Sequence, residues 1–263
     1  MMMSKTEQPI SMFTKAIVRF PAENFDQGIS HSGLGKPDYT RALEQHSSYC
    51  EALKKCGLDL IYLDADRRFP DSTFVEDTAI VTSNIAVIAR PGDQRRLGEE
   101  VEIEDVLSEH RDIERISPPG FIDGGDILQV DSHFFIGLSE RSNMEGANQL
   151  QAILKKYGYS SSTIDVGNML HLKSGVNHVG KNFLVVREEL IHHEDLHAFE
   201  KVIVPPDENY AANVVLVNDY LLIPKGFPKT KEKLLQSGFT ILELEMSEFQ
   251  KMDGGLSCLS LRF

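Results

Sequence analysis

A repeated pattern of paired apolar stretches is the feature of this sequence that most restricts its fold. Short polar turns with apolar, β-branched segments on both sides begin at residues 83, 131, 180 and 218. The turns are Ser83-Asn84, Asp131-Ser132, Gly180-Lys181 and Asn218-Asp219. Two-residue polar turns between such segments indicate β-hairpins.

A helix and a further strand follow each predicted hairpin. The helices are expected over residues 94–110, 140–157, 188–199 and 229–238. A repeat of about 40–50 residues is typical of architectures whose units cannot bury their apolar faces alone. The pattern therefore predicts stacked units, each made of a hairpin, a helix and a strand.

The two ends of the chain supply a fifth unit. Leu256–Arg262 and Lys15–Phe20 are short apolar strands that could pair as the missing hairpin, and a helix that Asp38 caps and that ends near Gly57 follows. Closure into a ring removes exposed sheet edges. The sequence thus predicts an α/β protein, a five-bladed pseudo-symmetric α/β propeller that forms a single closed ring. We expect one domain over residues 1–263, with residues 1–14 as a loose N-terminal extension.

Composition limits the partners of this fold. The formal net charge of -13 argues against nucleic-acid binding, because phosphate neutralisation needs clustered Lys and Arg. The longest apolar stretches fall short of the roughly 20 residues that cross a bilayer, and the first residues lack the apolar segment of a secretion signal. Three cysteines cannot all pair, which favours free thiols in a reducing compartment. We therefore expect a cytoplasmic protein that does not bind membranes.

Reactive side chains recur just before the predicted hairpins. Glu76 and Asp77 precede the first, Asp123 the second and His171 the third, and Cys258 opens the fifth. In a ring these segments face the centre, so a thiol, an imidazole and carboxylates from different units are expected to meet there. A thiolate is a strong nucleophile, and it needs an acid or base partner.

Four ordered motifs resemble the signatures of dimethylarginine dimethylaminohydrolases, which belong to a guanidino-group-modifying superfamily with the five-bladed propeller (pentein) fold. The motifs are Phe69-Pro-Asp-Ser-Thr-Phe-Val-Glu-Asp77, Ile122-Asp-Gly-Gly-Asp-Ile-Leu128, Leu170-His-Leu-Lys-Ser174 and Asp253-Gly-Gly-Leu-Ser-Cys258. The resemblance extends from about Lys15 to Phe263. It implies hydrolysis of Nω-methylated arginines to citrulline and methylamine or dimethylamine, through a covalent thiouronium intermediate and without a cofactor.

The resemblance also implies a role for each matching residue. Cys258 is the nucleophile, His171 the general acid and base, and Asp123 the carboxylate that orients the histidine. Some members of the family carry glutamate where this chain has Asp123. The remaining roles are guanidinium binding by Asp71, Glu76 and Asp77, α-carboxylate binding by Arg90 and Arg141, a place beside the nucleophile for Asp253, and a lid over residues 28–35. Paired carboxylates match the planar donors of a guanidinium, and the bound cation favours thiolate over thiol.

Other interpretations remain open. His193-Glu-Asp-Leu-His197 fits the H-E-x-x-H pattern of zinc hydrolases, which requires both histidines on one face of a helix. Cys258 and His171 could hold an inhibitory zinc ion. The chain could also be an arginine deiminase-like hydrolase of another guanidine, or a non-catalytic ring that binds arginine derivatives. The preferred guanidine and the oligomeric state, a homodimer included, stay open as well.

Overall fold

Five three-stranded sheets with the same connectivity make up the fold. The computed structural model describes residues 12–263, so the predicted extension lies outside the described residues apart from residues 12–14. The sheets have the orders β15-β1-β2, β3-β4-β5, β6-β7-β8, β9-β10-β11 and β12-β13-β14. The strands are β1 (Lys15–Arg19), β2 (Asp59–Leu63), β3 (Ala79–Val81), β4 (Ile85–Ile88), β5 (Asp112–Arg115), β6 (Ile127–Val130), β7 (His133–Leu138), β8 (Ser160–Asp165), β9 (Val176–His178), β10 (Phe183–Arg187), β11 (Glu200–Val204), β12 (Val215–Val217), β13 (Tyr220–Pro224), β14 (Ile241–Leu244) and β15 (Leu261–Arg262). In every sheet the central strand runs antiparallel to one neighbour and parallel to the other.

All four predicted hairpins are confirmed. The turn residues Asp131 and Asn218 have φ of 52°, and Lys181 has φ of 49°. Asp and Asn tolerate this left-handed region better than most residues, which is why such turns carry them. The hairpin register follows from these turns, for example in the pairing of Val130 with His133.

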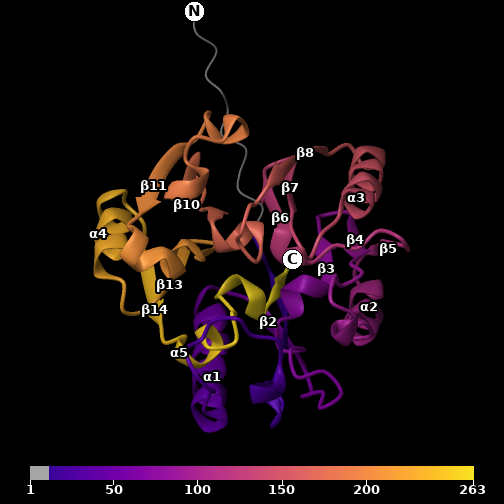
Figure 1. Ribbon diagram of the computed structural model, residues 1–263, viewed down its shortest axis with the longest axis horizontal. Coiled ribbons are helices and arrows are strands. Elements are labelled where there is room, and N and C mark those ends of the chain that lie inside the picture. The colour runs from indigo at the N-terminus through magenta and orange to yellow at the C-terminus, as the bar shows by residue number, and fades with distance from the viewer. Residues whose placement is uncertain (1–11) are drawn as a thin grey trace, which may run out of the picture.

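Helices lie at the periphery of the molecule (Figure 1). They are α1 (Tyr39–Lys55), α2 (Glu100–Ser108), α3 (Met144–Lys156), α4 (Pro228–Gln236) and the short α5 (Ser247–Gln250). The predicted cap of α1 is confirmed, since Asp38 Oδ1 accepts a hydrogen bond from the Arg41 N–H at 2.9 Å. The helix expected from residue 94 instead starts at Glu100, after a 3₁₀ turn over Gln94–Arg96.

The predicted helix over residues 188–199 is wrong. Two 3₁₀ turns, η6 (Glu188–Leu190) and η7 (Glu194–Leu196), replace it. The buried apolar anchors Leu190 and Leu196 are six positions apart, which on an α-helix would place them about 120° from each other. Two separate turns bury both side chains against the same cluster.

The central strand of each sheet is buried on both faces. Alternate side chains of a strand point to opposite faces, so each central strand contributes to two apolar clusters. Val18 of β1, for example, belongs to a cluster with Leu222 of β13, and its neighbour Ile17 belongs to one with Ala86 of β4. The other three clusters join β4 with β7, β7 with β10, and β10 with β13. Each sheet thus shares one cluster with the sheet before it and one with the sheet after it.

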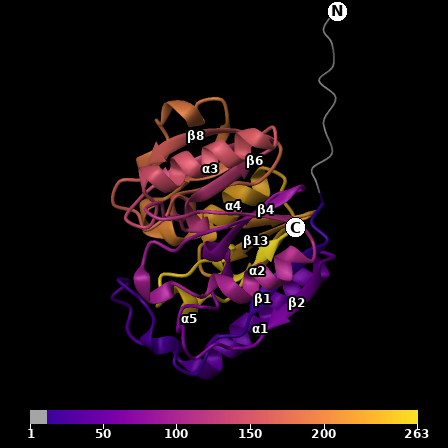
Figure 2. The ribbon, with the colours of Figure 1, turned by 90° about the vertical axis from the view of Figure 1, so that its right-hand side faces the viewer.

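The two ends of the described chain complete one sheet. β15 runs antiparallel to β1, with Ile17 opposite Leu261, as the sequence predicts. In both views the yellow C-terminal segment lies close to the indigo N-terminal elements (Figures 1 and 2). The strand is shorter than predicted, because Ser257–Leu259 form a 3₁₀ turn, and Cys258 lies on that turn.

No helix in residues 12–263 has both the length and the apolar character that a membrane span requires.

Candidate active site

Two adjacent cavities meet at Cys258 and His171. The larger has a volume of about 830 Å³ and is also lined by Glu76, Lys173 and Asn213. The smaller, of about 30 Å³, is lined by Asp71, Asp77, Arg96 and Arg141 on its far side. Cys258, His171 and Asp253 line both cavities, so the thiol and the imidazole lie on the boundary between them.

Short 3₁₀ turns bring these residues together. They are η2 (Val75–Thr78), which contains Glu76 and Asp77, η4 (Gly124–Asp126) directly after Asp123, η5 (Leu172–Ser174) directly after His171, and η9 (Ser257–Leu259), which contains Cys258. Each turn precedes the first strand of its sheet, and η4 packs against both η2 and η5. The convergence expected from the repeat is therefore present.

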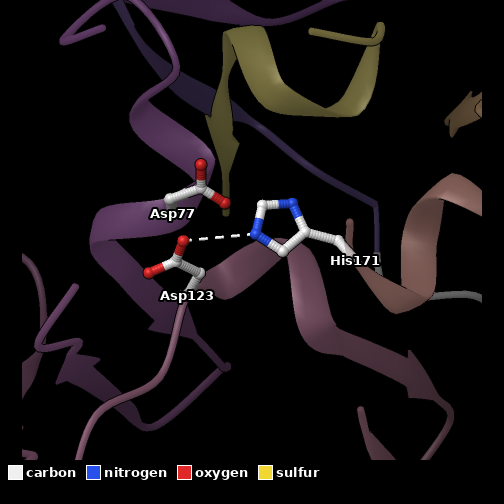
Figure 3. A group of neighbouring side chains, drawn as sticks. All are labelled: Asp77, Asp123 and His171. Atoms are coloured by element: carbon white, nitrogen blue, oxygen red, sulfur yellow. Dashed lines mark hydrogen bonds and ion pairs between the residues drawn. The ribbon is translucent and has the colours of Figure 1, made fainter. Parts of the chain in front are cut away.

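The carboxylates of Asp77 and Asp123 lie next to the His171 imidazole (Figure 3). Its Nε2 is 3.2 Å from Asp123 Oδ2, and both side chains are buried. Asp123 Oδ1 accepts the Gly92 N–H at 2.9 Å, which fixes the carboxylate. Burial opposes protonation of the imidazole, but Asp77, Asp126 and Asp123 together raise the pKa of His171 to about 9. The ring therefore carries its proton at neutral pH and is ready to act as an acid.

This raised pKa predicts a pH-dependent stability. Because the pKa of His171 is about 9 when folded and 6.5 in the reference state, its contribution is fully present below pH 6.5 and is lost as the pH rises through 9. We expect the free energy of unfolding of the wild type to fall relative to that of His171→Asn by up to about 1.4 kcal/mol per pH unit in this window. Urea titrations of both proteins from pH 6 to 10 measure the difference. A constant difference over this range would contradict the assignment.

Cys258 carries a neutral thiol at neutral pH. Its Sγ accepts a hydrogen bond from the Gly255 N–H at 3.4 Å. Burial, followed by the charges of Glu76 and Asp77, raises the pKa of Cys258 to about 12. A cation placed between the thiol and these carboxylates would reverse the unfavourable field, so ionisation of the sulfur should follow the binding of a cationic ligand.

The carboxylates Asp77 and Asp71 lie in different surroundings. Although burial opposes ionisation, His171 and Arg96 lower the pKa of Asp77 to about 2. Its oxygens contact Arg96 Nη1 at 2.6 Å and the Gly125 N–H at 3.0 Å. Burial raises the pKa of Asp71, whose oxygens accept the Ile29 N–H.

Glu76 lies on the side of the larger cavity. Its Oε1 is 2.7 Å from Lys173 Nζ, and its Oε2 accepts the Ser257 hydroxyl at 2.5 Å. Arg262 Nη2 is 3.5 Å from Oε1. Glu76 therefore has two cationic partners, Lys173 and Arg262.

Three hydrogen bonds join residues 28–35, the predicted lid, to Lys251 and Asp253, and the role of this segment as a lid stays a prediction. Asp253 Oδ2 accepts the His31 N–H at 2.5 Å, and the hydroxyls of Ser30 and Ser32 donate to the Lys251 carbonyl at 2.6 and 2.8 Å. Asp253 thus links the lid to the loop that carries the nucleophile. Ile29 and His31 of this segment line the smaller cavity.

The two predicted carboxylate-binding arginines differ in position. Arg141 lines the smaller cavity, with its Nη1 3.8 Å from Asp123 Oδ2. Arg90 is half-buried, pairs through its backbone with Ile122, and is not among the residues that line either cavity. Its role stays a prediction.

Arg96 is a further residue of the site that no sequence pattern indicated. This buried arginine pairs with Asp77 and makes a two-pronged contact to Glu99, at 3.0 Å from Nε and 2.7 Å from Nη2. It follows Gln94 and Arg95 in a polar segment that resembles surface. Only the tertiary neighbours distinguish Arg96 from Arg95, whose side chain is largely exposed.

The H-E-x-x-H motif does not form a helical zinc site. His193 and His197 flank the 3₁₀ turn η7, so they lack the one-face spacing of an α-helix. His197 Nε2 instead contacts the His192 carbonyl at 3.1 Å. Among the residues described, the group of potential ligand atoms within 4.8 Å of one another is that of Asp77, Asp123 and His171. A zinc ion on Cys258 and His171 stays a prediction.

Known proteins of one family match most of this chain. The family model described as N,N dimethylarginine dimethylhydrolase, eukaryotic, matches residues 36–259. The N(G),N(G)-dimethylarginine dimethylaminohydrolase of Pseudomonas aeruginosa is 44% identical over 254 residues, which is 96% of this chain and 100% of the relative. The enzyme of that name from Streptomyces coelicolor is 33% identical over 250 residues, 94% of this chain and 96% of the relative.

Solved structures give the same result. A cysteine-to-serine mutant of the Pseudomonas aeruginosa protein, complexed with citrulline, superimposes with a TM-score of 0.94 at 43% identity and covers 96% of this chain and 100% of its own. The N-terminal domain of the arginine dihydrolase ArgZ has a TM-score of 0.86 at 20% identity, covering 94% of this chain and 97% of its own, and shows likeness of fold alone. The matching family model and these two relatives, at 44% and 33% identity, establish that this chain belongs to the dimethylarginine dimethylaminohydrolase family.

Proposed function

We propose that this protein hydrolyses Nω-methylated arginines to citrulline and methylamine or dimethylamine. The observation that carries the proposal is the position of Cys258 and a protonated His171 at one boundary, facing the buried carboxylates Asp77 and Glu76. The similar Pseudomonas aeruginosa structure contains citrulline, which is the product expected of this reaction.

In the proposed mechanism the binding of the substrate promotes ionisation of the Cys258 thiol, which then attacks it. The guanidinium stays protonated at any working pH, and Asp77, Glu76 and Asp71 supply the acceptors that fix its plane. Its charge lowers the pKa of Cys258, whose proton leaves to water. The thiolate then forms a bond to the central guanidinium carbon.

His171 performs the two proton transfers. Its imidazolium donates a proton to the methylated nitrogen, the C–N bond breaks and the neutral amine leaves. A thiouronium ester remains on Cys258. The now neutral imidazole takes a proton from water, whose oxygen attacks the same carbon. The hydroxyl proton of this adduct goes to solvent as the C–S bond breaks, which releases citrulline and the thiolate. Asp123 holds the ring in position throughout, and the reaction needs no metal or organic cofactor.

The amino-acid end of the substrate would extend into the smaller cavity. Arg141 and Arg96 line that cavity and supply positive charge to it. We retain Arg90 and Arg141 as the α-carboxylate ligands. Opening of the lid at Ile29 and His31, two further lining residues, would provide the volume.

We infer that the five sheets close a ring in one domain. Four apolar clusters join successive sheets, and the fifth, through Val18 and Leu222, joins the last sheet to the first. The pairing of β15 with β1 supports the same inference.

Three unpaired thiols, Cys50, Cys56 and Cys258, support a reducing, cytoplasmic setting.

A panel of guanidines tests the function. We expect purified protein to release citrulline from asymmetric dimethylarginine and monomethylarginine, and to turn over agmatine, which lacks the α-carboxylate, at least about 100-fold less efficiently. A colorimetric ureido assay and amine detection follow both products. Citrulline from unmodified arginine alone would replace the proposal by an arginine deiminase, and binding without any product would replace it by a non-catalytic protein.

A further inference from the structure

The fourth unit of the fold has no part in the proposed mechanism, although its residues reach the same cavity. Asn213 follows the 3₁₀ turn η8 (Pro206–Ala212) and precedes β12, the place where the other units carry Glu76, Asp123, His171 and Cys258. It lines the larger cavity and is 7% exposed. A buried amide in this position needs partners for its hydrogen-bonding atoms.

Asn213 bridges the nucleophile turn (Gly255–Cys258) and the loop after His171. Its Oδ1 accepts the Ser257 N–H at 2.9 Å, and its Nδ2 donates to the Lys173 carbonyl at 3.1 Å and to Ser257 Oγ at 3.0 Å. A backbone N–H can only donate and a carbonyl can only accept, so these contacts fix which end of the amide is oxygen. The side chain uses both of its donors and one of its acceptor sites.

The Asn213 side chain also determines where the Ser257 hydroxyl directs its proton. Ser257 Oγ accepts from Asn213 Nδ2, so its single O–H is free to donate to Glu76 Oε2, at 2.5 Å. Glu76 is one of the charges that disfavour the thiolate of Cys258. A hydroxyl proton directed at this carboxylate weakens that effect.

The nucleophile turn packs directly on Asn213. A Cβ atom added at Gly255 would lie 2.4 Å from Asn213 Oδ1, so the loop can approach this closely only with glycine. Gly255 in turn donates its N–H to Cys258 Sγ, and its carbonyl accepts the Cys258 N–H at 3.3 Å. The position of the amide therefore sets the position of the one backbone donor that contacts the sulfur.

We propose that Asn213 is a positioning residue for catalysis, which holds the Gly255–Cys258 turn so that the Gly255 N–H faces the sulfur and the Ser257 hydroxyl faces Glu76. Asn213 acts through these groups and not on the substrate. The kinetic part of this inference rests on the proposed function.

The test uses the isosteric variant Asn213→Asp, with Asn213→Ala beside it. A carboxylate of the same shape places an oxygen against the Lys173 carbonyl and competes for the Ser257 proton. We expect kcat for dimethylarginine to fall about 100-fold, as for a misplaced reacting group, with KM changed less than about threefold. We also expect iodoacetamide to label Cys258 about tenfold more slowly at pH 9, as measured by mass spectrometry.

Asn177→Ala is the matched control. Asn177 is equally buried and donates to the same Lys173 carbonyl at 2.7 Å and to Ala212 at 2.8 Å, but these contacts do not reach the nucleophile turn. It should lower thermal stability and leave kcat and the labelling rate near wild type. General loosening of the loops would expose the thiol and accelerate labelling, so the direction of the change separates positioning from stability.

Two outcomes would overturn the inference. One is a kcat and a labelling rate for folded Asn213→Asp that match those of Asn177→Ala, and the other is an increase in KM alone. If neither Asn213 variant folds, Ser257→Ala removes the hydroxyl link from its other end, and an unchanged kcat there would also overturn it. Failure of the wild type to release citrulline would contradict the proposed function, while the labelling rates would still test Asn213.

Discussion

The Cys258→Ser variant should lose at least about 10⁴-fold in kcat for dimethylarginine while still binding it. A serine hydroxyl has a far higher pKa than a thiol, and the bound guanidinium cannot ionise it. The carboxylates that bind the guanidinium are unchanged, so the dissociation constant should stay within about threefold of wild type. Ureido assays measure the first quantity and isothermal titration calorimetry the second.

Cys56→Ser provides the control for this prediction. Cys56 is a free thiol at the C-terminal end of α1, and burial raises its pKa to about 11. Its replacement should leave kcat within about twofold of wild type, because a substitution remote from the site has little effect on the reaction. If Cys258→Ser kept more than about 1% of the wild-type kcat, a thiouronium intermediate on Cys258 would be ruled out.

The second large effect is expected at His171. In His171→Asn no acid protonates the leaving amine, so kcat for dimethylarginine should fall about 10²- to 10⁴-fold. A substrate whose leaving group departs as a thiolate needs no such proton. S-methyl-L-thiocitrulline should therefore still acylate Cys258 in this variant, but the adduct should persist because no base activates water. Intact-protein mass spectrometry detects the adduct directly.

His197→Asn, in the exposed turn of the H-E-x-x-H motif, is the control and should keep full activity. Loss of activity in His197→Asn together with chelator sensitivity would favour metal chemistry, and rapid turnover of the thiocitrulline by His171→Asn would contradict the role of the histidine as base.

The sequence was informative wherever the determining interactions are local. The hairpin turns are set by residues such as Asn218 and Asp131, whose left-handed φ depends on the residue itself. The central strands are short apolar stretches next to polar turns, so the repeat and its place for Cys258 and His171 could be predicted. The crossover over residues 188–199 could not, because the separate burial of Leu190 and Leu196 depends on the neighbouring sheet.

The sequence by itself determined the number of repeated units, the strands and turns within them, and the residues that stand at the equivalent place in each unit, near the start of its hairpin. The tertiary structure alone decided the chemical state of those residues. The protonation of His171, the neutral thiol of Cys258, the burial of Arg96 and the bridge made by Asn213 all arise between segments that are distant along the chain. Backbone periods and turn preferences act over a few residues, whereas desolvation and charge pairing depend on whatever the fold places within a few ångströms.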